Sequence, residues 1–145
     1  MKIFLGAPFV NWIDPKTDQL EEKHKKFIKK LIAFFESKGH EITNAHQREA
    51  WGKKFLGNKK ATKLDLDEVK NCDLFIAIPG TPASGGVHIE IGWGAAQKKK
   101  ILLLLNLKKN YSPLIHGLIE NEKNIKAIKY AAEKGLFRKL EKMFK

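Results

Sequence analysis

Two short, uninterrupted apolar runs constrain the fold of this chain more than any other feature. Leu74 to Ile78 and Ile101 to Leu105 each contain five consecutive apolar residues. That is the length of a strand, not of a membrane span, which needs roughly 20 residues. A strand that is apolar on both faces is typical of a parallel sheet covered by helices on both sides. The two runs therefore predict the centre of an α/β sheet.

Segments with helical periodicity alternate with strands along the rest of the chain. Further strands are predicted at Ile3 to Leu5, His40 to Asn44 and Ile125 to Tyr130. Helices are predicted from Thr17 or Asp18 to Gly39, from Ala61 to Asn71, from Val87 to Lys99 and from Ala131 to Phe144. This order predicts one domain over residues 1–145, with a doubly wound, flavodoxin-like five-stranded parallel sheet and helices on both faces.

Composition agrees with one domain, because 145 residues that are 43% hydrophobic can bury one full core but hardly two. The net charge of +12 comes from 28 cationic and 16 acidic residues. Only Arg48 and Arg138 among the cations can make bidentate contacts. A solvated, lysine-rich surface is the favoured interpretation, followed by attraction of a small anionic ligand. Binding to a nucleic acid polymer is the least favoured.

Several sequence features bear on the compartment. No apolar run is long enough to cross a bilayer, and Ile3 to Leu5 is too short for the core of a secretory signal. The single cysteine, Cys72, cannot form an intrachain disulfide. We therefore expect a cytoplasmic protein that does not bind membranes.

Ligands of doubly wound sheets bind at the carboxyl ends of the strands. The sequence Ser84-Gly85-Gly86 lies there, between an apolar strand and a helix, where backbone amides can bind a phosphate. Glu90 follows between Ile89 and Ile91, and small residues after it predict a helix packed closely on the sheet. The favoured interpretation is a carboxylate in the crevice, although most helical glutamates are solvated.

Other polar residues near the strand ends have two interpretations each. Asp65 can belong to a solvated acidic helix face or to the site, and His46 can be a structural or a functional histidine. Arg48 follows His46 closely, after a predicted strand. The five histidines and one cysteine show no metal-ligand spacing, so we expect neither a metal nor a cofactor.

Four motifs together resemble the cytidylate hydrolases of peptidyl-nucleoside antibiotic pathways, which belong to the nucleoside 2-deoxyribosyltransferase superfamily. The resemblance extends from about Ile3 to about Leu118. Its motifs are Phe4-Leu5-Gly6-Ala7-Pro8-Phe9, Asn44-Ala45-His46 with Arg48-Glu49-Ala50-Trp51-Gly52, Leu64-Asp65 with Asp67-Glu68, and Ser84-Gly85 with His88-Ile89-Glu90-Ile91-Gly92-Trp93.

The resemblance implies roles for the residues that match it. Glu90 corresponds to the catalytic glutamate, as nucleophile or stabiliser of an oxocarbenium ion, and Asp65 or His46 would donate a proton to the leaving base. Ser84 stands where nucleoside transferases commonly have a sugar-binding aspartate, which favours a substrate with a 5′-phosphate. Ser84, Gly85, Gly86 and Arg48 would bind that phosphate. Gly6, Phe9 and Trp12 would contact the base or sugar.

Two departures from the family pattern accompany these matches. Phe4 replaces a tyrosine that is common in the transferases, and Val10 replaces a basic residue present in some of the hydrolases. The expected activity is hydrolysis of the N-glycosidic bond of a pyrimidine nucleoside 5′-monophosphate, such as cytidylate or deoxycytidylate. Base exchange by a deoxyribosyltransferase and nucleotide binding without turnover remain the alternatives.

The resemblance also implies a homodimer, because superfamily members usually complete their sites at a subunit interface. The segment from Asn106 to Gly117 is one candidate for that interface. The aperiodic stretch from Ala45 to Lys60, which we interpret as a functional loop, is another, because Trp51 and Phe55 have no obvious partner within the chain.

Overall fold

The computed structural model describes residues 1–145, in which strands and helices alternate. The main sheet contains β1 (Lys2–Gly6), β4 (Glu41–Asn44), β5 (Leu74–Ala77), β6 (Ile101–Asn106) and β7 (Ile125–Tyr130). The α-helices are α1 (Glu22–Ser37), α2 (Ala45–Arg48), α3 (Asn58–Asn71), α4 (Gly85–Ala96), α5 (Pro113–Asn121) and α6 (Glu133–Met143). The 3-10 turns η1 (Val10–Trp12) and η2 (Ala50–Gly52) and the hairpin strands β2 (Ile13–Asp14) and β3 (Gln19–Leu20) complete the chain.

The five strands of the main sheet are all parallel, in the order β4-β1-β5-β6-β7. From β1 the chain moves outward to β4 and then returns past β1 to β5, so the strand order reverses between β1 and β5. This is the topological switch point at which doubly wound sheets bind ligands. The predicted fold class is confirmed.

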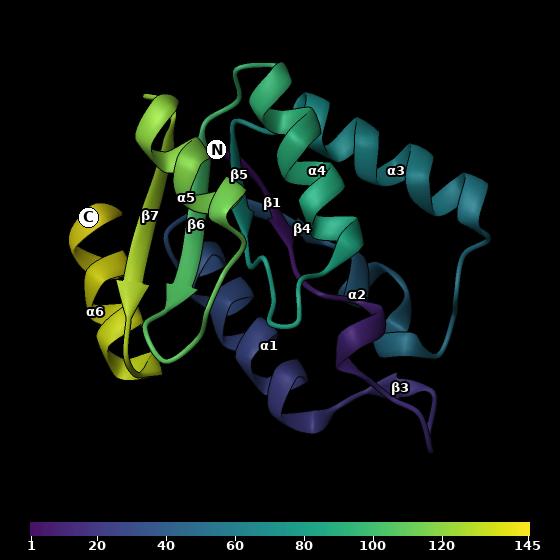
Figure 1. The fold of residues 1–145 in the computed structure, drawn as a ribbon. Helices are drawn as coiled ribbons and strands as arrows, with labels where there is room; N and C mark the ends of the chain where they lie inside the picture. The colour runs from purple at the N-terminus through teal and green to yellow at the C-terminus, as the bar shows by residue number, and fades with distance from the viewer.

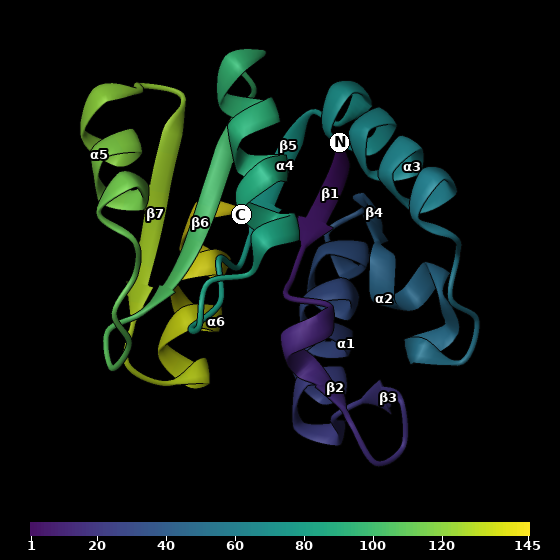
Figure 2. The ribbon, with the colours of Figure 1, turned by 45° about the vertical axis from the view of Figure 1, so that its right-hand side comes forward.

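Helices cover both faces of the sheet, as Figures 1 and 2 show. Alternate strand residues point to opposite faces, so Ile3 and Leu5 pack with α1 and α6, whereas Phe4 packs with α3, α4 and α5. The central strands β5 and β6 bury both faces, as their uninterrupted apolar sequence predicted. No helix has both the length and the apolar character that crossing a membrane requires.

Helix α4 lies close to the sheet because it has glycine where a side chain would collide with a strand. A Cβ atom at Gly94 would lie 3.0 Å from Cδ1 of Ile101, tighter than most real contacts. Val87, Glu90 and Ile91 are buried on the same helix. The small residues that predicted this close packing therefore bring the Glu90 side chain to the carboxyl end of the sheet.

The start of α1 was predicted incorrectly. The helix begins at Glu22 and not at Thr17 or Asp18, because the preceding segment forms an antiparallel hairpin in which Ile13 pairs with Leu20. Asp18 has a left-handed backbone with φ of 53°, which no helix accommodates. Figure 2 shows the hairpin beyond the carboxyl end of β1.

The two segments proposed as candidates for the subunit interface contain helices. The stretch from Ala45 to Lys60 contains α2, η2 and the first residues of α3, and the Asn106–Gly117 segment contains the start of α5, where Ser112 accepts a hydrogen bond from the Leu114 amide. Trp51 packs against the α1 core, with the ammonium groups of Lys25 and Lys29 5.8 and 5.4 Å from its ring centre. Trp51 is therefore partnered within the chain, contrary to expectation.

The packing around Phe75 gives a prediction for stability. Phe75 is fully buried in β5, stacks on Phe4 with ring centres 5.2 Å apart, and contacts the α4 face. Phe75→Ala leaves a cavity and should lower the free energy of unfolding by about 3–5 kcal/mol. Urea denaturation measures this. Leu114→Ala, at a side chain that is 79% exposed, serves as the control and should change it by less than about 0.5 kcal/mol. If Phe75→Ala were as stable as the control, the packing of Phe75 would not contribute to the stability of the sheet centre.

Candidate active site

Glu90 is a buried carboxyl without a hydrogen-bond partner. It lies in the second turn of α4 with 8% of its surface exposed, and its Oε2 atom is buried without a donor. Gly6, the last residue of β1, lies against it, because a Cβ atom there would be 2.8 Å from that oxygen. A buried polar group with no partner destabilises the fold, so its retention points to a functional role.

Burial and two neighbouring charged groups determine the protonation state of Glu90. Burial raises the pKa of its carboxyl to about 8, and the nearby Asp65 carboxylate acts in the same direction. The Arg48 guanidinium opposes both by lowering this pKa. With a pKa of about 8, most Glu90 side chains carry a proton at neutral pH when the site holds no ligand.

Arg48 and Asp65 form an ion pair beside Glu90. The pair joins α2 to α3, with 2.7 Å between Nη2 of Arg48 and Oδ1 of Asp65, and both side chains are about one-fifth exposed. Nε of Arg48 is buried and has no partner. Part of the guanidinium predicted to bind phosphate is thus engaged by a carboxylate, and its Nε–H remains free.

A hydrogen bond from His46 links α2 to the loop that follows β1. Its ring is fully buried, and Nε2 donates a hydrogen bond to the Pro8 carbonyl at 2.7 Å, so Nδ1 is unprotonated and has no partner. Burial lowers the pKa of the imidazole to about 4. Asn44 adds a second link, since its amide donates to the Leu5 carbonyl at 2.9 Å. His46 is therefore a neutral ring that fixes the Pro8 turn.

The two aromatic residues predicted to contact the base lie in different surroundings. Phe9 stacks on His46 with ring centres 4.4 Å apart, and Phe55 meets Phe9 edge to face at 5.6 Å. Trp12 stacks on His24 at 4.0 Å and lies 6.4 Å from His46. Each of the two aromatic rings therefore has a histidine ring stacked on one of its faces.

The predicted phosphate loop forms the start of α4. Ser84 is the buried N-cap, and its hydroxyl accepts a hydrogen bond from the Val87 amide at 3.4 Å. Gly85 and Gly86 are exposed, with open space where a Cβ atom would lie. Their backbone amides are thus accessible to an anion at the positive end of the helix. His88, which the sequence analysis assigned no role, donates from Nδ1 to the Ser84 carbonyl at 2.7 Å.

Two loops meet at the switch point and are tied to each other. Gly80 has φ of 79°, and a Cβ atom there would lie 2.7 Å from Cγ of Pro8. Asn11 donates from its side-chain amide to the Pro82 carbonyl at 3.1 Å. Neither Gly80 nor Asn11 was a predicted site residue, because a contact between loops more than 70 residues apart leaves no local pattern.

The structure thus brings Glu90, Asp65, Arg48 and Gly6 into one cluster at the end of β1. His46 and Phe9 flank it through the Pro8 turn, and Ser84 to Gly86 begin the helix that carries Glu90. Trp12 lies apart, against α1. The result is a buried, protonatable carboxyl beside an ion pair, on a helix whose first residues are exposed.

Comparisons with known proteins identify the family of this chain. The family profile described as Nucleoside 2-deoxyribosyltransferase matches residues 3–139. The CMP N-glycosidase BcmB of Clostridium botulinum is 40% identical, with 97% of this chain and 99% of that chain covered and a TM-score of 0.74. The solution structure of BlsM is 38% identical, with coverage of 90% and 81% and a TM-score of 0.77.

A more distant structure supports the fold alone. The 2-deoxyribosyltransferase of Bacillus psychrosaccharolyticus is 21% identical, with 72% of each chain covered and a TM-score of 0.55. No match was found among curated proteins. Because the family profile spans nearly the whole sequence and BcmB is similar over its full length, the chain belongs to the nucleoside 2-deoxyribosyltransferase family.

Proposed function

We propose that this protein hydrolyses the N-glycosidic bond of a pyrimidine nucleoside 5′-monophosphate of the cytidylate type, releasing the base and a (deoxy)ribose 5-phosphate. The observation that carries the proposal is the buried Glu90 carboxyl without a hydrogen-bond partner, on a helix whose N-terminal residues Gly85 and Gly86 are exposed. The likeness to BcmB, a CMP N-glycosidase, supports the same chemistry.

The spacing along α4 suits a nucleotide. Glu90 follows Ser84 by six residues, which is about 9 Å along a helix axis at 1.5 Å per residue. A ribose 5-phosphate can span this region with C1′ at the Glu90 carboxyl and its phosphate at the amides of Gly85 and Gly86. Ser84 adds no negative charge there, so a phosphate dianion is tolerated.

The reaction would proceed in two displacements at C1′. The Glu90 carboxylate forms a bond to C1′ while the bond from C1′ to the base nitrogen breaks, and the base leaves with a proton. Water then attacks C1′, gives a proton to the site, and releases the sugar phosphate with Glu90 regenerated. The Arg48–Asp65 pair beside Glu90 supplies fixed charges near the developing oxocarbenium ion.

The proton for the leaving base would come from the pair of carboxyls. With its pKa at about 8, the Glu90 carboxyl carries a proton at neutral pH, beside the carboxylate of Asp65. Passing that proton from Glu90 to Asp65 creates the ionised nucleophile and the protonated acid in one step. His46 is a weaker candidate for the acid, because its only N–H is donated to Pro8.

The experiment that tests the proposal is a panel of nucleoside 5′-monophosphates incubated with the protein and analysed for free base by chromatography. We expect base release from cytidylate or deoxycytidylate. A parallel reaction with deoxycytidine and free adenine tests base exchange, because a transferase would form deoxyadenosine. No base release from any nucleotide would overturn the proposal.

Replacing the Glu90 carboxylate should abolish turnover. Glu90→Gln keeps the shape but removes the nucleophile and the negative charge, so we expect a loss of about 10³-fold or more in kcat. The same chromatographic assay measures it, with circular dichroism to verify folding. The exposed Glu120→Gln is the control and should keep full activity. Near-normal turnover in the Glu90 variant would rule out this mechanism.

The pH dependence should follow Glu90. The reaction uses the proton that Glu90 carries and passes to Asp65, and the site loses this proton as the pH rises through about 8. The value of kcat/KM should therefore be level below pH 8 and fall about tenfold per pH unit above it. Arg48 lowers this pKa. Arg48→Met should therefore move the fall in kcat/KM to higher pH. A fall at lower pH in this variant would contradict the assignment.

A negative charge at position 84 should lower the activity on substrates that carry a 5′-phosphate. Ser84→Asp still caps the helix but places a carboxylate beside the dianion, which should cost about 2 kcal/mol, or roughly thirtyfold in kcat/KM for the monophosphate. Activity on the corresponding nucleoside should fall much less. Ser84→Asn is the matched control, because it caps the helix without charge. Equal losses for nucleotide and nucleoside would show that Ser84 does not face the phosphate.

The homodimer remains part of the proposal. Leu66 on α3 and Ile89 on α4 are 38% and 56% exposed on two helices that contact each other, which gives a two-fold interface apolar surface to bury. Because each chain has a charge of +12, subunit repulsion weakens with salt, and the dimer should persist or tighten. Light scattering over an ionic-strength series measures this, with Ile89→Lys to disrupt it. A fully active monomer at every concentration would contradict it.

A further inference from the structure

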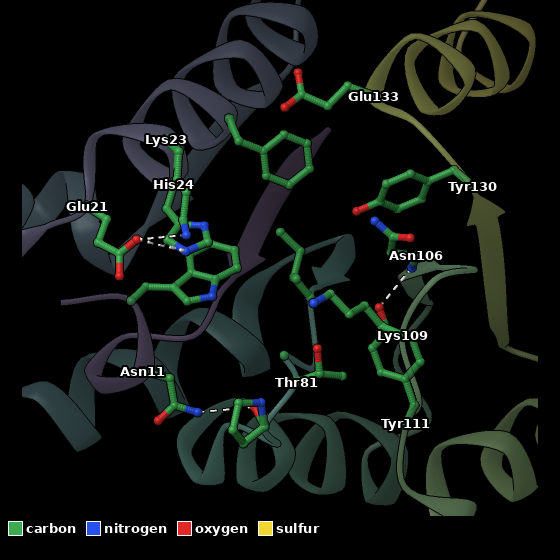
Figure 3. Close-up of a pocket in the computed structure, with 15 residues that line it drawn as sticks. Asn11, Glu21, Lys23, His24, Thr81, Asn106, Lys109, Tyr111, Tyr130 and Glu133 are labelled. Carbon is green, nitrogen blue, oxygen red and sulfur yellow. Dashed lines mark hydrogen bonds and ion pairs between the residues drawn. The ribbon is translucent and has the colours of Figure 1, made fainter. Parts of the chain in front are cut away.

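A second cavity lies at the carboxyl edge of the sheet, outside the Glu90 cluster. Figure 3 shows it between the start of α1, the start of α6 and the loops that follow β5 and β6. Its volume is about 470 Å³, and Glu90, Asp65 and Arg48 are not among the residues that line it. The reaction described above therefore leaves this cavity without a role.

The acidic residues of the cavity are neutralised by neighbours. Glu21 pairs with Lys23 at 3.0 Å, and Glu133 pairs with Lys30 at 2.8 Å. Burial lowers the pKa of His24, which favours its neutral form. Lys109 has no carboxylate partner, and Figure 3 shows its side chain extending into the cavity. The uncompensated charge of the cavity is thus a single ammonium group.

Two phenols add neutral donors beside this ammonium. The Tyr111 hydroxyl accepts a hydrogen bond from the backbone N–H of Asn106 at 2.8 Å. The hydroxyl proton of Tyr111 therefore remains free to donate. The Tyr130 hydroxyl has no partner within the protein, and burial raises the pKa of both phenols, that of Tyr130 to about 12. Both therefore stay protonated at any physiological pH. In Figure 3 their hydroxyls are turned toward Asn106 and Lys109.

We propose that this cavity binds a small phosphomonoester, with its phosphate held by Lys109, Tyr111 and Tyr130. One ammonium and two hydroxyls can each donate to a different terminal oxygen of a phosphate, whereas a carboxylate offers only two oxygens. The volume exceeds that of a phosphate alone. Trp12, Phe27 and Ile78 line the remaining space and can contact the organic part of the ligand.

An amide-resolved NMR titration with ribose 5-phosphate tests this proposal. We expect saturable shifts at the amides of Thr81, Asn106 and Tyr130, separate from any response at Ser84 to Gly86. Inorganic phosphate should bind the same amides more weakly if the sugar is contacted, and equally if the phosphate group alone is recognised; both results support the site. No saturable shift at the cavity amides, or acetate binding as tightly as phosphate, would overturn it.

Variants assign the binding to the named side chains. Lys109→Met should weaken the affinity measured at the cavity amides about tenfold, and Tyr130→Phe should weaken it about threefold or more. Lys108→Met is the matched control, because it removes the same charge from the neighbouring residue, which does not line the cavity. An equal loss in the Lys108 variant would reduce the effect to overall charge and overturn the site. Because binding and not turnover is measured, the result does not depend on the proposed hydrolysis.

Discussion

The arrangement of the site depends on how closely α4 approaches the end of β1. Two absent side chains permit it: Gly94 lets the helix lie against β6, and Gly6 leaves room for the Glu90 carboxyl at the strand end. Once that carboxyl is enclosed between a helix and a sheet, water cannot solvate its charge. The pKa of Glu90 and its sensitivity to Asp65 and Arg48 follow from this contact.

The same contact has a thermodynamic cost that the rest of the fold must offset. A carboxyl buried without a partner is unfavourable in either protonation state, and the ionised state is worse. The two apolar layers on either side of the sheet, each continuous with a set of helices, supply the stability. Destabilised groups of this kind gather at functional sites, where activity and stability conflict.

The sequence was most informative where burial is uniform. Leu74 to Ile78 and Ile101 to Leu105 identified the central strands, and the small residues around Glu90 indicated that its helix packs tightly. The sequence could not predict which residues of separate segments pair with each other. Arg48 faces Asp65 from another helix, and β2 pairs with β3 through a turn that needs a left-handed residue. Periodicity gives the face on which a residue lies but not the residue opposite, so the partners of Arg48 and Trp12 could not be predicted.

The aromatic residues around the Pro8 turn form a continuous series of ring contacts between three parts of the molecule. His24, Trp12, His46 and Phe9 form a series of nearly parallel rings from α1 through the β1–α1 loop to α2. Stacked rings can shift parallel to their planes, but steric repulsion prevents them from moving closer together. A displacement of Trp12, on the side of the second cavity, therefore has to be accommodated by the rings next to Phe9. The stack therefore joins the cavity that Trp12 lines to the side of the Pro8 turn on which Phe9 lies.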